Sequence, residues 1–130
     1  MRTDRPTPLD VSERALLLDL LAHDFAGVEA LRVQARAVEA VKGCACGCGT
    51  IELTPLGTEL PRSDAESPVP VVGDVLDAAG KPVGGLLLFV EDGLLSSLEV
   101  YSEADVSPLP LPRADQVRWF ARAHASDRAD

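Results

Sequence analysis

The stretch VGGLLLFVEDGLLSSLEVY, residues Val83–Tyr101, decides the fold class of this chain. Asp92-Gly93 lies in its middle, and this residue pair is one of the strongest short signals for a β-hairpin turn. The apolar residues on either side predict one strand over Val83–Val90 and a second over Leu94–Tyr101. A two-residue turn between them makes the pair antiparallel.

Further strands are predicted on the N-terminal side of this hairpin. Val69–Leu76 is separated from it by the turn Asp77–Gly80. Earlier, Val38–Val41 and Thr50–Leu53 flank the Gly- and Cys-rich segment Gly43–Gly49, which is typical of a second hairpin. The sequence therefore predicts an antiparallel sheet of about five strands.

Three helices are predicted at the two ends of the chain. Asp10 and Glu13 have the spacing of a capping box, which predicts a helix that runs from there to about His23. A second helix is expected over Gly27–Arg36, and a last one over Arg113–His124. The last helix would place three residues on one face: Val117, Phe120 and His124. Strands grouped between helices, rather than alternating with them, indicate an α+β fold.

Length and charge limit the classes of function. The 130 residues predict a single α+β domain over residues 1–124 with a disordered tail over 125–130. The net charge of −9 argues against binding to nucleic acid or to a membrane surface, because both are anionic. The polar start Met1–Asp10, the short apolar runs and the odd count of three cysteines predict a soluble, cytoplasmic protein.

The three cysteines form the motif Cys44-Ala-Cys46-Gly-Cys48. In an extended segment their sulfur atoms would project to one side, where three thiolates could bind Zn²⁺ or Cu⁺. The spacing is not that of zinc knuckles, and nothing in the sequence brings His23 or His124 near as a fourth ligand. The alternative is a tight Gly-rich turn with reduced thiols and no cofactor, and this is the interpretation that we favour.

Two other groups of side chains are candidates for function. Carboxylates gather in sequence around the main hairpin and could support acid–base catalysis, although charged residues are also usual near exposed turns: Glu91, Asp92, Glu99, Glu103 and Asp105. On the strand Leu94–Tyr101, period-two alternation puts Leu98 and Val100 on one face. The other face carries Ser97, Glu99 and Tyr101, which would form a binding face if it is exposed.

The apolar run Leu86–Val90 bears on assembly. It has no alternation of apolar and polar residues, so both faces of the sheet should be covered there. The predicted N-terminal helices cover one face. The other needs the last helix, the Pro-Leu segment Ser107–Pro112, or a second copy of the chain. We expect a homodimer that pairs the two sheets, with a monomer covered by the last helix as the alternative.

Several stretches together resemble a family of small uncharacterised bacterial proteins, common in actinobacteria. They include the Glu13–Leu17 and Phe25–Arg32 segments, the turn region Asp77–Gly84, and the two parts Val90–Gly93 and Leu98–Tyr101 of the hairpin. The resemblance covers most of the chain. It implies a cytoplasmic bacterial protein and assigns no residue to a role.

The sequence thus favours a binding or interaction protein that acts stoichiometrically on a protein partner, as an immunity protein or an antitoxin does. A metal-binding protein built on the three cysteines is the second hypothesis. A small carboxylate-based enzyme is the third, and we favour it least because carboxylates near a hairpin turn are the usual composition of a solvated loop.

Overall fold

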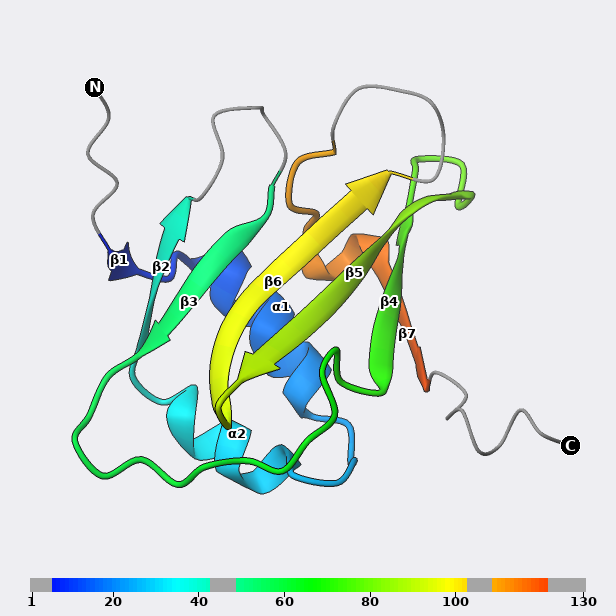
Figure 1. The fold of residues 1–130 in the computed structure, drawn as a ribbon. Helices are drawn as coiled ribbons and strands as arrows, with labels where there is room; N and C mark the ends of the chain where they lie inside the picture. Colours follow the sequence, from blue (N-terminus) through cyan, green and yellow to red (C-terminus); the bar gives the residue numbers. More distant parts are fainter. Residues whose placement is uncertain (1–5, 43–48, 103–108, 122–130) are drawn as a thin grey trace, which may run out of the picture.

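The computed structural model describes residues 6–42, 49–102 and 109–121. The described residues form an α+β fold with two α-helices and a seven-stranded sheet (Figure 1). In chain order the elements are β1 (Thr7–Pro8), α1 (Val11–Leu21), α2 (Val28–Gln34), β2 (Val38–Lys42), β3 (Ile51–Pro55), β4 (Val71–Leu76), β5 (Pro82–Glu91), β6 (Leu94–Ser102), the 3₁₀ turn η1 (Ala114–Gln116) and β7 (Val117–Ala121).

The sheet is antiparallel throughout, with the strand order β1-β2-β3-β6-β5-β4-β7. Its two halves are the β2–β3 hairpin and the β4–β5–β6 meander, joined where β3 pairs with β6. The last strand, β7, pairs with β4. The two edge strands, β1 and β7, therefore come from the two ends of the described chain.

The predicted hairpin over Val83–Tyr101 is confirmed. Leu86 lies opposite Val100 and Leu88 opposite Leu98. Asp92 and Gly93 at the turn have φ values of 55° and 79°. A two-residue turn with positive φ at both positions is of type I′, whose twist matches that of the strands on either side.

The predicted N-terminal helices are also present. The side chain of Asp10 accepts a hydrogen bond from the Glu13 amide at 2.8 Å, and Glu13 accepts one from the Asp10 amide at 2.9 Å, which completes the capping box. At the other end of α1, the Arg32 guanidinium donates to the Leu21 carbonyl at 2.6 Å. This bond satisfies a carbonyl that the helix itself leaves unpaired, and it links α2 to α1.

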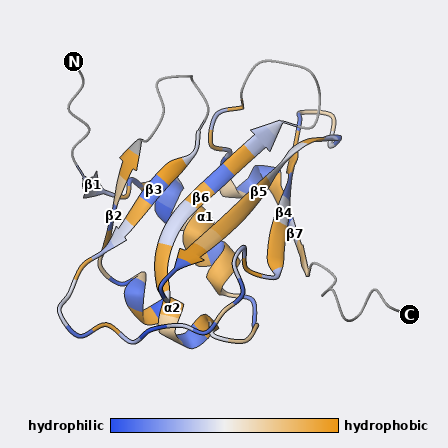
Figure 2. Ribbon diagram, in the orientation of Figure 1, coloured by the Kyte–Doolittle hydropathy of each residue, from blue (hydrophilic) through white to orange (hydrophobic). Residues whose placement is uncertain are grey.

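The core lies between the sheet and α1, which crosses behind it in Figure 1. Hydrophobic residues are concentrated on α1, β4 and β5 (Figure 2). One side of α1 and the inner side of the central strands supply the most deeply buried side chains: Leu16, Leu17, Leu20, Leu21, Ile51, Leu86, Leu88 and Leu98. Leu109 and Leu111, on the segment before η1, pack against the same core.

The C-terminal helix predicted over Arg113–His124 is wrong. A 3₁₀ turn occupies Ala114–Gln116, and β7 follows it over Val117–Ala121. The side chains of Val117 and Trp119 pack against the core, whereas Phe120 is exposed, so the period is two. Two physical reasons favour the strand. β-branched and aromatic residues, which β7 contains, favour strands. In addition, β7 pairs with the edge of β4 that would otherwise be without a partner strand. His124 lies outside the described residues.

The prediction of about five strands was too low. The structure adds β1, which has two residues, and β7. The tail 125–130 lies outside the described part of the chain.

Candidate functional site

The face of the sheet opposite α1 is the candidate site. We call it the outer face and define it by the strand residues that point away from the core on β2 to β7: Glu39, Val41, Glu52, Thr54, Val72, Asp74, Gly85, Leu87, Phe89, Ser97, Glu99, Tyr101, Arg118 and Phe120. Helix α1 and η1 contact each other on the opposite, inner side of the sheet. No described helix lies over the outer face (Figure 1).

An apolar row crosses the outer face from β5 to β7. Leu87 on β5 lies opposite Glu99 on β6, and Val72 on β4 lies opposite Phe120 on β7. The register of β4 against β5 makes Val72 the cross-strand neighbour of Leu87. Three apolar side chains therefore stand side by side on three strands, with a carboxylate at the end of the row.

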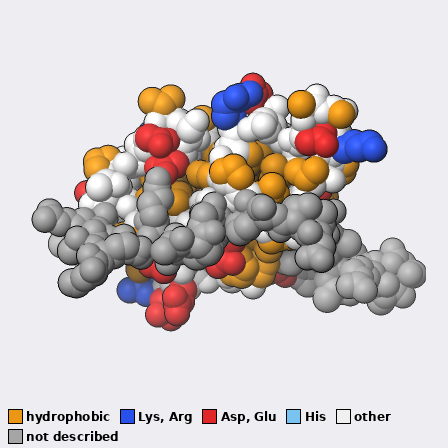
Figure 3. Space-filling model, turned by 90° about the horizontal axis from the view of Figure 1, so that it is seen from above, with side chains coloured by type: hydrophobic (Ala, Val, Ile, Leu, Met, Phe, Trp, Pro, Cys, Tyr) orange, Lys and Arg blue, Asp and Glu red, His pale blue; other side chains and the backbone are white. Residues whose placement is uncertain are grey.

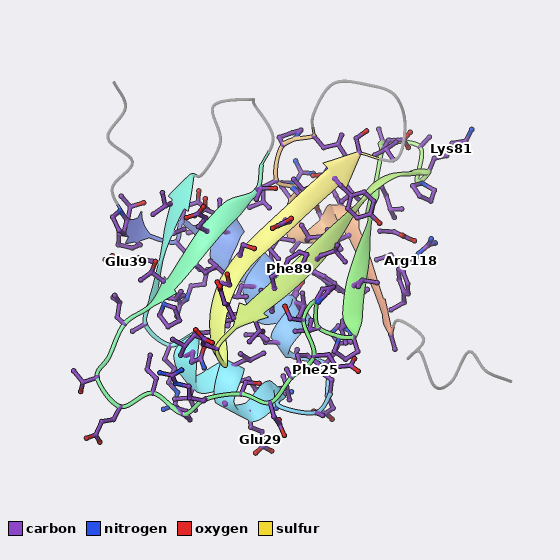
Figure 4. The ribbon with its side chains drawn as sticks, in the orientation of Figure 1. Phe25, Glu29, Glu39, Lys81, Phe89 and Arg118 are labelled. Atoms are coloured by element: carbon purple, nitrogen blue, oxygen red, sulfur yellow. The ribbon has the colours of Figure 1, made fainter. Side chains whose placement is uncertain are left out.

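A second row runs beside the first. Phe89 on β5 lies opposite Ser97 on β6, and Ser97 lies opposite Glu52 on β3. Phe89 is labelled near the middle of the sheet in Figure 4. In both rows an apolar residue lies on β5 and a carboxylate lies toward β3: Leu87 and Glu99 in the first row, Phe89 and Glu52 in the second. We call Leu87, Val72, Phe120 and Phe89 together the apolar patch.

Tyr101 and Arg118 belong to a third row, on the other side of the apolar patch. The Tyr101 ring covers Gly85, where an added Cβ would collide with the Cζ and hydroxyl oxygen of that ring. Glycine at this position therefore lets the Tyr101 ring pack flat against the sheet. At the β7 edge, Arg118 Nη2 donates to Asp74 Oδ2 at 2.9 Å.

The aromatic residues of the outer face are accessible to solvent. Tyr101 is 46% exposed and Phe120 is 44% exposed. Leu87 and Phe89 are half-buried among their neighbours on the sheet. Figure 3 looks down on one end of the sheet rather than onto the outer face, and there hydrophobic side chains and Asp and Glu side chains both reach the described surface.

The predicted binding residues Ser97, Glu99 and Tyr101 all lie on the outer face, as period-two alternation requires. They differ in accessibility. Tyr101 is exposed and Glu99 is half-buried, whereas Ser97 is only 8% exposed. The Ser97 hydroxyl donates to Glu99 Oε2 at 3.1 Å, so Ser97 positions a carboxylate rather than offering a surface of its own. That these residues bind a partner stays a prediction.

The carboxylates of the main hairpin are spread out. Glu91 and Asp92 are exposed at the turn end, where Glu91 pairs with Leu94. Glu99 lies five residues further along β6, which corresponds to roughly 17 Å in a strand. Glu103 and Asp105 lie outside the described residues. The three described carboxylates of the hairpin, Glu91, Asp92 and Glu99, therefore do not come together as a close pair at the turn.

The cysteine motif cannot be placed, since Cys44, Cys46 and Cys48 lie outside the described residues. Within the described ranges, no group of three His, Cys, Asp or Glu side chains could hold a metal ion. His23 lies just after α1, as predicted. Its Nδ1 is 3.0 Å from the Asp19 carbonyl oxygen and 3.2 Å from that of Leu20, at the helix C-terminus.

Two open hollows lie elsewhere on the described surface. One, of about 560 Å³, is lined by residues 24, 25 and 27–30 at the start of α2. The other, of about 370 Å³, lies where β3 and β6 diverge. Arg62 on its rim donates to the Asp92 carbonyl oxygen at 2.7 Å. Neither hollow is lined by a described histidine or cysteine.

The sequence by itself does not reveal the apolar patch. Leu87 and Phe89 lie in an apolar run without alternation, and the helix predicted over Arg113–His124 puts Phe120 on a helix face. The alternation of Val117, Trp119 and Ala121 with Arg118 and Phe120 was the signal that could have found the outer position of Phe120.

Comparisons with known proteins assign the chain to no family, because no family model, curated protein or solved structure matches it. The resemblance to small bacterial proteins stays a prediction. No helix among the described residues is both long and apolar enough to cross a membrane.

Proposed function

We propose that this chain is a binding protein that acts stoichiometrically on a protein partner and contacts it through the outer face. The observation that carries the proposal is the exposure of Tyr101 and Phe120 on a face that no described helix covers. The half-buried Leu87 lies between the strands that carry them, and Val72, which is 7% exposed, connects it to Phe120. The half-buried Phe89 continues the apolar surface along β5. Contiguous exposed apolar surface on a small domain is typical of an interaction site.

The shape and chemistry of the outer face favour a protein over other ligands. It is a sheet surface with aromatic and aliphatic side chains at its centre and charged side chains around them, and protein interfaces have the same arrangement. The net charge of −9 disfavours nucleic acid. The wide separation of Glu99 from Glu91 and Asp92 supports binding over catalysis. An immunity or antitoxin protein, which neutralises its partner by occupying it, is one kind of protein that would work in this way.

The proposal can be tested with two matched double variants. Phe120→Ser with Tyr101→Ser removes two side chains from the outer face that are 44% and 46% exposed. The control, Leu18→Ser with Leu56→Ser, removes two that are 44% and 43% exposed on α1 and on the loop after β3. Each double variant should first be shown to unfold cooperatively at a temperature close to that of the wild type.

The measurement is affinity capture from cells of the source organism, followed by reconstitution with the purified captured protein. We expect a one-to-one complex with the wild type and with the control variant. The outer-face variant should bind at least about tenfold more weakly, because large aromatic side chains that become buried at an interface carry much of the binding free energy. Equal binding by both double variants would refute the outer face as the site.

A further inference from the structure

We infer that the partner presents a cationic segment with apolar side chains, which lies across β3, β6 and β5. Its Lys or Arg side chains would face Glu52 and Glu99, and its apolar side chains would contact Leu87 and Phe89. The inference rests on the proposed function and specifies the chemistry of the partner.

Three carboxylates form a line across the outer face. On β2, Glu39 lies opposite Thr54 of β3, two residues from Glu52. Glu52 lies opposite Ser97 of β6, two residues from Glu99. Each step moves one strand across and two residues along, so the three carboxylates form a diagonal, which we call the acidic diagonal. Figure 4 labels Glu39 at the end of the diagonal, on the side of the sheet away from Arg118.

The acidic diagonal leads directly to the apolar patch. Glu99 is the cross-strand neighbour of Leu87, and Ser97 separates Glu52 from Phe89. The hydrogen bond from Ser97 to Glu99 Oε2 holds this carboxylate at the border between the two regions. A segment that crosses the strands would therefore meet negative charge on β3 and β6 and apolar side chains on β5.

No described cation neutralises these carboxylates. Arg118 is the one basic side chain among the outer-face residues, and it is paired with Asp74 at the β7 edge. The other described ion pairs, Arg32 with Asp24 and Arg113 with Asp115, lie outside the sheet strands. Unpaired like charges on one face repel each other, and a complementary cationic surface would relieve this repulsion.

The charge of the outer face also indicates whether a different protein or a second copy of the chain binds there. Two copies would each bring the acidic diagonal and a net charge of −9 to the same interface. Juxtaposed like charges suppress association, whereas opposite charges accelerate it. The same charges therefore favour a cationic protein over a homodimer at this face.

The inference can be tested with three synthetic peptides of equal length and with full-length protein. In the first peptide Lys alternates with Leu, in the second Lys alternates with Ser, and in the third Glu alternates with Leu. Binding is measured by fluorescence anisotropy at low and at physiological salt. The test variant is Glu52→Gln with Glu99→Gln. The control, Glu29→Gln with Glu59→Gln, removes the same charge from exposed positions on α2 and on the loop after β3.

We expect the Lys-Leu peptide to bind the wild type more tightly than either other peptide. The test variant should weaken this binding by roughly tenfold at low salt, and the control by no more than about twofold. Added salt should weaken binding to the wild type more than binding to the test variant, because it screens charges that the variant lacks.

Four outcomes would overturn the inference: absence of binding, equal binding of the Lys-Ser peptide, an equal loss in the control variant, or a dimeric mass by light scattering that Phe120→Ser reduces to a monomer. Failure here is distinguishable from failure of the proposed function. If Phe120→Ser with Tyr101→Ser abolishes capture of the partner but Glu52→Gln with Glu99→Gln has no effect, the outer face binds a partner of other chemistry.

Discussion

Gln34 connects parts of the chain that are far apart in sequence. Its side chain is completely buried at the end of α2. Nε2 donates to the carbonyl oxygens of Pro61 and Gly93, each at 2.8 Å, and Oε1 accepts from the Leu95 amide at 2.8 Å. One amide thus pairs with backbone groups of the loop after β3 and of the main hairpin. A buried polar side chain with every contact satisfied specifies a single arrangement of these elements.

Replacement of Gln34 by methionine should test this role. The new side chain has a similar shape but removes the hydrogen bonds to the Pro61 carbonyl and from the Leu95 amide. The Gly93 carbonyl loses one of two donors, since it also accepts from the Ser63 amide at 2.9 Å. We expect the free energy of unfolding to fall by about 3 kcal/mol, because each unsatisfied buried group costs roughly 1 to 3 kcal/mol. Urea denaturation followed by circular dichroism gives the value.

The matched control is Gln116→Met. Gln116 also accepts a backbone hydrogen bond, from the Arg113 amide at 2.9 Å, but this contact is exposed. The control should cost under about 1 kcal/mol. Similar losses in the two variants would mean that the Gln34 contacts add nothing beyond an ordinary exposed hydrogen bond.

At the scale of the element, β7 depends on a glycine in the neighbouring strand. Gly73 on β4 lies opposite Trp119 on β7. An added Cβ at Gly73 would lie 2.5 Å from Val117 Cγ1 and 3.0 Å from the Trp119 ring. The absence of a side chain at Gly73 therefore lets the inner side chains of β7 reach the core.

The Gly73→Ala variant should displace β7 without unfolding the rest of the sheet. We expect the free energy of unfolding to fall by about 2 kcal/mol, as is usual for an overpacked site. Trp119 is the single tryptophan of the chain, so its fluorescence emission should shift to longer wavelength as the ring becomes more exposed to water.

Gly80→Ala is the control for this prediction. Gly80 has a φ of 82° and no atom within 4 Å of an added Cβ, so alanine there causes backbone strain and no collision. We expect a loss of about 1 kcal/mol with the tryptophan emission unchanged. An unchanged emission in Gly73→Ala as well would contradict the packing of β7 against Gly73.

At the scale of the whole molecule, the described core is formed by buried apolar side chains and by strand pairing. The β2 and β3 strands, which flank the cysteine motif, are paired over five residue pairs, and Ala40, Ile51 and Leu53 on them are buried. A structural zinc site normally has four protein ligands, whereas the motif supplies three. Stability of the fold therefore should not depend on Cys44, Cys46 and Cys48.

Elemental analysis of the purified full chain tests this expectation. We expect well under one equivalent of zinc, and the triple variant Cys44→Ser, Cys46→Ser, Cys48→Ser should unfold within a few degrees of the wild type. One equivalent of bound zinc that the triple variant loses, together with a clear fall in the unfolding temperature, would instead favour the metal-binding hypothesis.

The elements that the sequence determined by itself have local causes. The hairpin follows from Asp92-Gly93, a residue pair that favours the type I′ turn, and α1 begins where Asp10 and Glu13 cap each other. The placement of Ser97, Glu99 and Tyr101 on one face follows from the period of the strand alone. All these features depend on residues that are close in sequence, so they could be predicted without the tertiary structure.

Tertiary structure alone decided β7, the contacts of Gln34 and the apolar patch. Residues 113–121 have spacings that fit a helix as well as a strand, and pairing with β4, more than 40 residues away, selects the strand. That choice places Phe120 beside Val72, and so completes the apolar patch. The acidic diagonal likewise joins β2, β3 and β6 through cross-strand registers that no local spacing encodes.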